Sequence, residues 1–134
     1  MEIKWSDELA TGHGDIDADH QKLIGIINHL ATLIQSEDIE QIGDILCELT
    51  EYVTIHFGRE EFIMQAVRYP QSESHQMAHC EFFAKLTKFV YLYETGEAGL
   101  GQDILDYLGE WLKAHEANED KALVQTCNFT AAIS

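Results

Sequence analysis

The stretch IGDILCELTEYVTIHFGREEFIM, residues 42–64, decides the fold, because its apolar side chains recur at helical spacing over several turns. One face of this segment carries Ile42, Ile45, Leu46, Leu49, Tyr52, Val53, His56, Phe57, Glu60 and Met64. The pattern predicts a long amphipathic helix. We expect it to end before Tyr69-Pro70, which contains the only proline, because the residue before a proline disfavours helical geometry.

Three other segments have the same apolar spacing. Residues from about 18 to 36 form the first, and the turn Ser36-Glu37-Asp38 offers side chains that cap the helix after it. A later segment runs from His75 to Tyr93, and glycines at 96, 99 and 101 then interrupt the pattern. The last begins near Ile104 and continues past Asp120. The sequence has no alternation typical of strands, so we expect the regular structure to be helical.

We therefore predict one all-α domain over residues 1–134, folded as an antiparallel, up-down-up-down four-helix bundle. This length is enough for one well-buried core. Residues 1–17 lack a sustained period and are predicted to form an irregular N-terminal arm. The bundle should cover about residues 18–126, and residues 127–134 should form a frayed tail.

The chain is strongly acidic, with 8 lysines and arginines against 24 aspartates and glutamates and a formal charge of −16. Such a surface cannot neutralise phosphates, which argues against nucleic acids and anionic membranes as partners. No apolar run is long enough to span a membrane. The three cysteines are widely spaced and suit neither a disulfide framework nor a thiolate zinc site, so we expect a cytoplasmic location.

Five histidines and two carboxylates fall at helix ends that share one level of the predicted bundle. They are His20, His56, Glu60, His75, His79, His115 and Asp120. Burying such a layer is costly unless a cation holds it, because polar groups lose their contacts with water. Imidazole and carboxylate ligands suit iron, manganese or zinc. A single zinc ion needs only four ligands, so seven donors indicate two metals.

Several strings at these positions resemble the hemerythrin family, in particular the bacterial hemerythrins. They are Ile16-Asp17-Ala18-Asp19-His20, His56-Phe57-Gly58-Arg59-Glu60-Glu61, Tyr69-Pro70, His75-Gln76-Met77-Ala78-His79 and Trp111-Leu112-Lys113-Ala114-His115, followed by Asp120. The resemblance extends from Trp5 to about Leu123. It implies a centre of two iron ions, without haem, with a bridging oxo or hydroxo group. In that centre His75, His79 and His115 would bind one iron, His20 and His56 the other, and Glu60 and Asp120 would bridge them.

The same resemblance implies reversible O2 binding at an open iron position, for oxygen sensing, transport or storage rather than catalysis. The implied partners are O2, related small ligands such as peroxide, nitric oxide and azide, and an attached or separate signalling output domain. One alternative is a di-iron peroxidase, oxidase or redox sensor. A less favoured one is an iron-handling or nitric-oxide-responsive module.

The sequence departs from the family pattern at Glu116, where a bulky apolar residue usually follows the last histidine ligand. On an ideal α-helix Glu116 and Asp120 share a face, whereas His115 and Asp120 are less well aligned. Glu116 either extends to solvent between helices or is a third carboxylate. As a third carboxylate it would coordinate an iron, or hydrogen-bond metal-bound solvent, at the position where O2 binds.

Four other side chains have simpler interpretations. His13 and His29 are expected to face solvent, because His13 precedes the first helix and His29 lies off the apolar face that carries His20. Cys80 is expected to pack as a small hydrophobe, and Phe83 is expected to lie in the core.

Overall fold

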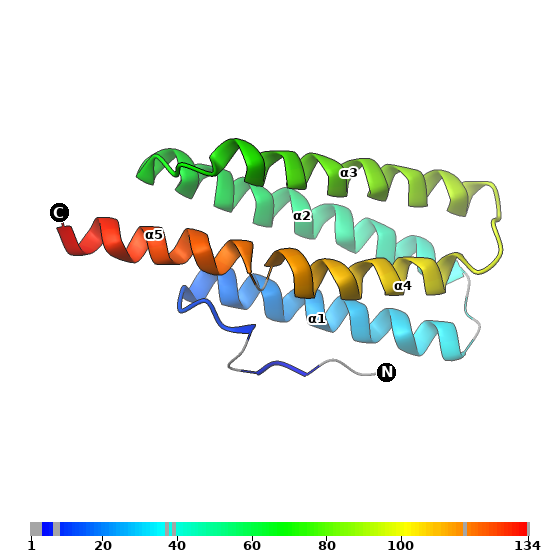
Figure 1. The fold of residues 1–134 in the computed structure, drawn as a ribbon. Coiled ribbons are helices and arrows are strands. Elements are labelled where there is room, and N and C mark those ends of the chain that lie inside the picture. Colours follow the sequence, from blue (N-terminus) through cyan, green and yellow to red (C-terminus); the bar gives the residue numbers. More distant parts are fainter. Residues whose placement is uncertain (1–3, 7–8, 37, 39, 117, 134) are drawn as a thin grey trace.

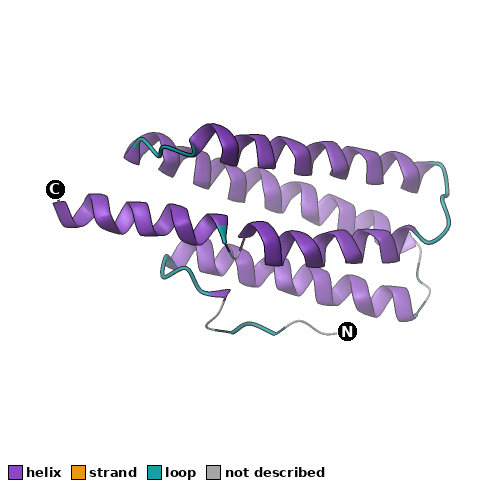
Figure 2. Ribbon diagram, viewed as in Figure 1, coloured by secondary structure: helices purple, strands orange, loops and turns teal. Residues whose placement is uncertain are grey.

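The computed structural model describes residues 4–6, 9–36, 38, 40–116 and 118–133, without the side chains of Glu116 and of residues 129–133. Its helices are α1 (Gly14–Gln35), α2 (Glu40–Val67), α3 (Ser72–Glu94), α4 (Leu100–Trp111), the π-helix η2 (Leu112–Glu116) and α5 (Glu119–Ile133). The described residues contain no strand, as Figure 2 shows. The prediction of an all-α fold is confirmed.

The helices form an antiparallel bundle in which α4, η2 and α5 together make the fourth member (Figure 1). Helix α1 packs against α2 and α4, and α3 packs against α2 and α4. Helix α5 follows η2 and packs along the other end of α2. The predicted four-helix bundle is therefore confirmed, with each helix lying beside its neighbour in the sequence.

Helix α1 begins at Gly14, so the prediction that the irregular arm extends to residue 17 was wrong. The reason is a local network that the periodicity did not show. Thr11 donates from its backbone nitrogen and its hydroxyl to Asp17 Oδ1, at 2.8 and 2.7 Å. His13 is the N-cap, and its Nδ1 accepts from the backbone nitrogen of Ile16 at 3.3 Å. The bond from Ile16 satisfies an N–H group of the first turn that has no intrahelical partner, and the bonds from Thr11 tie the preceding loop to the helix.

The ends of α2 follow the sequence expectation. Asp38 Oδ1 accepts from the backbone nitrogen of Gln41 at 3.3 Å, so the predicted capping turn does cap the helix, while Glu37 lies outside the described residues. At the other end α2 stops at Val67, and Arg68 adopts a left-handed φ of 52° that turns the chain toward Pro70. Proline thus marks the boundary where its geometry predicts one.

The fourth segment differs most from the prediction. It was expected to be a continuous helix from Ile104 past Asp120, but η2 interrupts it between Trp111 and Glu119. Helix α5 then continues to Ile133, so a helix occupies most of residues 127–134, where a frayed tail was predicted.

The core consists of two clusters separated by the histidine layer. The larger one fills the bundle between α1, α2, α3 and α4 and includes Ile27, Leu49 and Ile104, all fully buried. The smaller one contains Met64, Tyr69 and Leu123 beyond the layer. The histidines therefore lie between apolar side chains on both sides, which keeps solvent away from them.

Two further observations concern membrane-spanning segments and the cysteines. None of the described helices combines the length and the apolar character needed to cross a bilayer. Cys47, Cys80 and Cys127 are free thiols. Cys80 is exposed, so its predicted packing as a small hydrophobe was wrong.

Candidate metal centre

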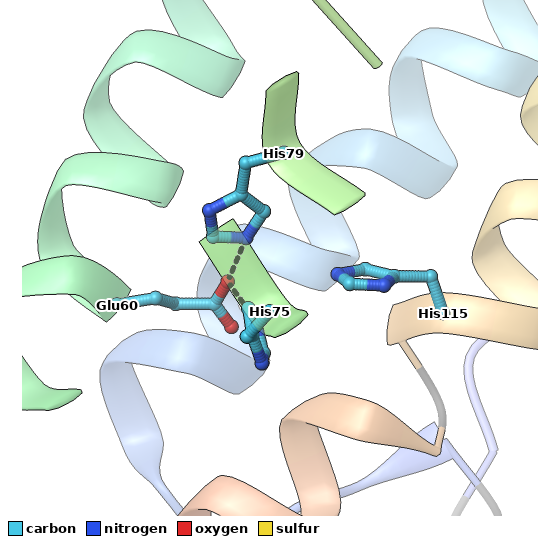
Figure 3. A group of neighbouring side chains, drawn as sticks. All are labelled: Glu60, His75, His79 and His115. Atoms are coloured by element: carbon cyan, nitrogen blue, oxygen red, sulfur yellow. Dashed lines mark hydrogen bonds and ion pairs between the residues drawn. The ribbon is translucent and has the colours of Figure 1, made fainter. Parts of the chain in front are cut away.

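The seven predicted donors converge into two adjacent groups inside the bundle. One group contains Glu60, His75, His79 and His115, and the other contains His20, His56 and Asp120. Within each group, one donor atom from every residue lies within 4.8 Å of the others. All seven side chains are buried, with exposed fractions of 4% or less. Figure 3 shows the first group, in which Glu60 points between His75 and His79 while His115 faces them from the opposite side.

Each helix contributes at the same level. His20 lies on α1, while His56 and Glu60 lie one turn apart on α2. His75 and His79 lie one turn apart on α3. The i, i+4 spacing places both members of each pair on the inward face of its helix.

The last two donors lie in and just beyond the π-helix η2, where the chain departs from α-helical geometry. Residues five apart diverge on an α-helix, but a π-helical turn closes i→i+5 and returns them to one face. His115 lies in η2 and Asp120 follows it by five residues, and both are buried. The assumption of an ideal α-helix here, which aligned Glu116 with Asp120, was therefore wrong. The side chain of Glu116 lies outside the described residues.

The two carboxylates connect the groups. Glu60 Oε1 lies 3.2 Å from His75 Nε2 and 3.0 Å from His79 Nε2, and its Oε2 lies 3.6 Å from His56 Nε2. Asp120 Oδ2 lies 2.8 Å from His20 Nε2 and 3.5 Å from His56 Nε2, while its Oδ1 lies 3.2 Å from His75 Nε2. Each carboxylate thus presents one oxygen to each group of histidines.

The surroundings shift the pKa values of His79, His115 and Asp120 toward the forms that bind metals. Burial, with repulsion from His75 and His115, lowers the pKa of His79 to about 3. Burial also lowers the pKa of His115 to about 4, although Asp120 opposes the shift. Burial alone would raise the pKa of Asp120, but the contacts of its carboxylate with the imidazoles of His20, His56 and His75 hold that pKa well below its usual range. Neutral imidazoles and an ionised carboxylate are the states that coordinate metals.

One buried atom indicates directly that a cation fits. His115 Nδ1 is hydrogen-bonded to Glu119 Oε2 at 2.7 Å, so Nε2 is the nitrogen that faces the group. His115 Nε2 is buried and has no hydrogen-bond partner among the described residues. An unpaired nitrogen in an apolar setting is costly. A cation bound by its lone pair would remove that cost.

Aromatic rings enclose the donors. Phe57 stacks on His79 with ring centroids 3.8 Å apart, and Trp111 stacks on His115 at 4.1 Å. Tyr52 lies parallel to His56 at 5.3 Å. The rings hold the imidazoles in place and leave little room for water.

The remaining expectations can be compared with this geometry. His29 is exposed as expected, and His13 is half-buried because it caps α1. Phe83 is 38% exposed, so its predicted place in the core was wrong, although its ring contacts Phe57. It lies on α3 beyond the inward face that carries Phe82 and Leu86.

Sequence reasoning missed two carboxylates that contact the outer nitrogens of the histidines. Asp19 Oδ2 lies 3.0 Å from His56 Nδ1, and Glu119 Oε2 lies 2.7 Å from His115 Nδ1. The i, i+4 spacing of His115 and Glu119 is a signal that could have identified the second. The contact of Asp19 joins residues 37 apart in the sequence and has no local signal.

The chain is similar to known proteins of one family. Residues 11–127 match the family model of the hemerythrin HHE cation binding domain. A bacteriohemerythrin of Pseudomonas aeruginosa is 31% identical over 122 residues, which cover 91% of this chain and 79% of the relative. A bacteriohemerythrin of Clostridium acetobutylicum is 30% identical over 125 residues, covering 90% of this chain and 97% of the relative.

More distant similarity extends to a myohemerythrin and to solved structures. Myohemerythrin-1 of Phascolopsis gouldii is 26% identical over 117 residues, covering 87% of each chain. A crystal structure of a hemerythrin with a leucine-to-alanine substitution superposes with a TM-score of 0.85 at 26% identity, covering 92% of this chain and 95% of that one. The family model, these relatives and the fold agree, and the chain belongs to the hemerythrin family.

Proposed function

We propose that this protein binds O2 at a non-haem di-iron centre and serves in oxygen sensing, transport or storage. One observation carries the proposal: Glu60 and Asp120 each contact histidines of both donor groups. A carboxylate that presents one oxygen to each of two sites is suited to bridge two metal ions. Membership of the hemerythrin family supports iron as the metal and O2 as the ligand.

The proposed ligand set follows the two groups. His75, His79 and His115 would hold one iron, and His20 and His56 would hold the other. Glu60 and Asp120 would bridge the pair. Three histidines on one iron and two on the other leave the second with fewer protein ligands, which favours a small ligand there.

Bound iron would supply reversible electron transfer to O2, while the protein sets the surroundings. Phe57, Trp111 and Tyr52 stack on three of the histidines and exclude water. The cluster of Met64, Tyr69 and Leu123 closes the other side. Water exclusion matters because it limits proton delivery, and protons promote irreversible oxidation of such a centre.

Anaerobic loading with Fe²⁺ tests the proposal. We expect two irons per chain, and a change in visible absorption on adding O2 that sparging with argon reverses. The Glu60→Gln variant should bind fewer than two irons, because it loses one bridging oxygen. The neighbouring Glu61→Gln variant is the matched control and should bind two. Fewer than two irons in the unaltered protein would overturn the proposal.

The alternative is an enzyme that turns over peroxide or O2. Its sequence basis is Glu116, proposed as a third carboxylate at the O2 position. That proposal now rests on the residue type alone, since η2 removes the alignment argument. Irreversible oxidation on mixing with O2, together with turnover of a peroxidase dye, would favour the enzyme over the carrier.

The other partners expected from the sequence remain predictions. Peroxide, nitric oxide and azide are small enough to enter the same site. A signalling output domain and a cytoplasmic location are likewise expectations from the sequence. The three free cysteines are consistent with a reducing compartment.

A further inference from the structure

Two histidines of the proposed centre use their outer ring nitrogen to contact a carboxylate outside the ligand set. His56 Nδ1 lies 3.0 Å from Asp19 Oδ2, and His115 Nδ1 lies 2.7 Å from Glu119 Oε2. An ionised carboxylate only accepts hydrogen bonds, so in each pair the histidine donates. The proton is then on Nδ1, and the lone pair of Nε2 is directed into the donor group.

The two carboxylates differ in how their charge is balanced. Asp19 Oδ2 also accepts a hydrogen bond from Arg59 Nε at 3.0 Å. Arg59 Nη1 lies 3.7 Å from Asp15 Oδ2 as well. In the part of the chain that the structure describes, neither lysine nor arginine pairs with Glu119. A guanidinium therefore offsets the charge of Asp19, whereas the charge of Glu119 has no such cationic partner among the described residues.

The position of His115 makes this contact more important than the one to His56. His115 lies in η2, where the main chain changes from α- to π-helical geometry shortly before α5 begins at Glu119. Its ring is held on one face by Trp111, 4.1 Å away, and at its edge by Glu119. A stacked ring can still flip by 180° about its Cβ–Cγ bond or exchange its tautomer, and the hydrogen bond to Glu119 opposes both changes.

We propose that Glu119 is the positioning residue of the metal site formed by Glu60, His75, His79 and His115. It holds His115 in the tautomer and orientation that direct Nε2 to the metal, and its uncompensated charge makes that imidazole a stronger donor. The inference rests on the proposed di-metal function. Loss of such an outer carboxylate typically weakens metal affinity by roughly 10- to 100-fold.

Titration of the metal-free protein with Co²⁺ tests the inference without any O2 chemistry. We expect two ions in the unaltered protein, and in Glu119→Ala one of the two should bind roughly 10- to 100-fold more weakly. Glu119→Gln should lose less, because its amide oxygen still accepts the hydrogen bond without the charge. Glu110→Ala, which removes an exposed carboxylate of α4, is the control and should bind both ions normally.

A double-mutant cycle separates positioning from a general charge effect. In a His115→Gln background, Glu119→Ala should cause no further loss of affinity, because the residue acts through His115. Circular dichroism of the metal-free variants checks that the helices persist. Unchanged affinity for both ions in Glu119→Ala, or an equal loss in Glu110→Ala, would overturn the inference. Binding of fewer than two ions by the unaltered protein would overturn the proposed function and this inference together. That result differs from the two variant results, which overturn the inference alone.

Discussion

At the scale of single residues, the seven side chains that the sequence predicts as donors lie together in the structure because their spacing carries the information. His75 and His79 share a helix face whatever the rest of the fold does, and so do His56 and Glu60. Their convergence follows from an antiparallel bundle with short connections. The outer carboxylates could not be found in this way. The contact between Asp19 and His56 depends on how α1 and α2 are rotated relative to each other, which no local pattern specifies.

The sequence predicts a role for Glu116 at the O2 position. This stays a prediction, because the side chain lies outside the described residues. If its carboxylate occupies the O2 position, azide must displace it in the oxidised, iron-loaded protein. We expect Glu116→Ile to bind azide at least about tenfold more tightly, a difference of about 1.4 kcal/mol. The measurement is an azide titration followed by its charge-transfer absorption. Glu110→Ile is the control, and equal affinity with an identical absorption band in Glu116→Ile would rule out coordination by Glu116.

At the scale of elements, helix boundaries were predicted well where proline or side-chain caps define them. The end of α2 before Pro70 and the cap at Asp38 are examples. The start of α1 was placed too late because Thr11 and Asp17 form a network that apolar periodicity does not report. The π-helix η2 has no sequence signature of its own. Its residues are those of an ordinary helix, and we infer that the π-helical geometry allows His115 and Asp120 both to face the centre.

If the spacing of His115 and Asp120 depends on η2, inserting a residue and deleting a residue between them should have opposite effects on iron binding. Inserting one alanine after Asn118 places Asp120 six residues from His115 and turns its carboxylate by about 100° from the centre. We expect the insertion variant to bind fewer than two irons. Deleting Asn118 leaves the two residues four apart, a spacing that a continuous α-helix aligns, so we expect this variant to keep both irons.

Iron content per chain, with helicity measured by circular dichroism, distinguishes these outcomes. An alanine inserted after Asn128, beyond the last ligand, is the control for the effect of lengthening α5. The interpretation of η2 would be wrong if the insertion after Asn118 kept two irons, or if the deletion lost them while remaining helical.

At the scale of the whole molecule, the buried histidine layer makes stability depend on pH and on metal. The pKa of His79 is lowered to about 3 and that of His115 to about 4, chiefly by burial. In the unfolded chain both titrate near 6.5. Between these values the unfolded chain binds protons that the folded protein does not, so the free energy of unfolding of the metal-free protein falls as pH decreases below about 6.5.

The size of this effect follows from the same linkage. Each such histidine contributes up to about 1.4 kcal/mol per pH unit while only the unfolded state is protonated. Asp120, with its pKa held below the usual 3.8, adds a further loss of stability below that pH, where its carboxyl group is protonated in the unfolded chain but not yet in the folded protein. We therefore expect urea unfolding of the metal-free protein to give steadily lower free energies from about pH 7 toward about pH 4.

Metal binding should act against this loss, because an ion bound only by the folded state stabilises it. The stabilisation should be largest near neutral pH and should shrink on acidification, as protons compete for the same nitrogens. Replacing His79 with glutamine should flatten the pH dependence of the metal-free protein, whereas His29→Gln, on the exposed face of α1, should leave it unchanged. If the free energy of unfolding of the metal-free protein were equal at about pH 7 and about pH 4.5, the histidines would not be buried in their neutral form. The reason for expecting a cation between them would then be lost as well.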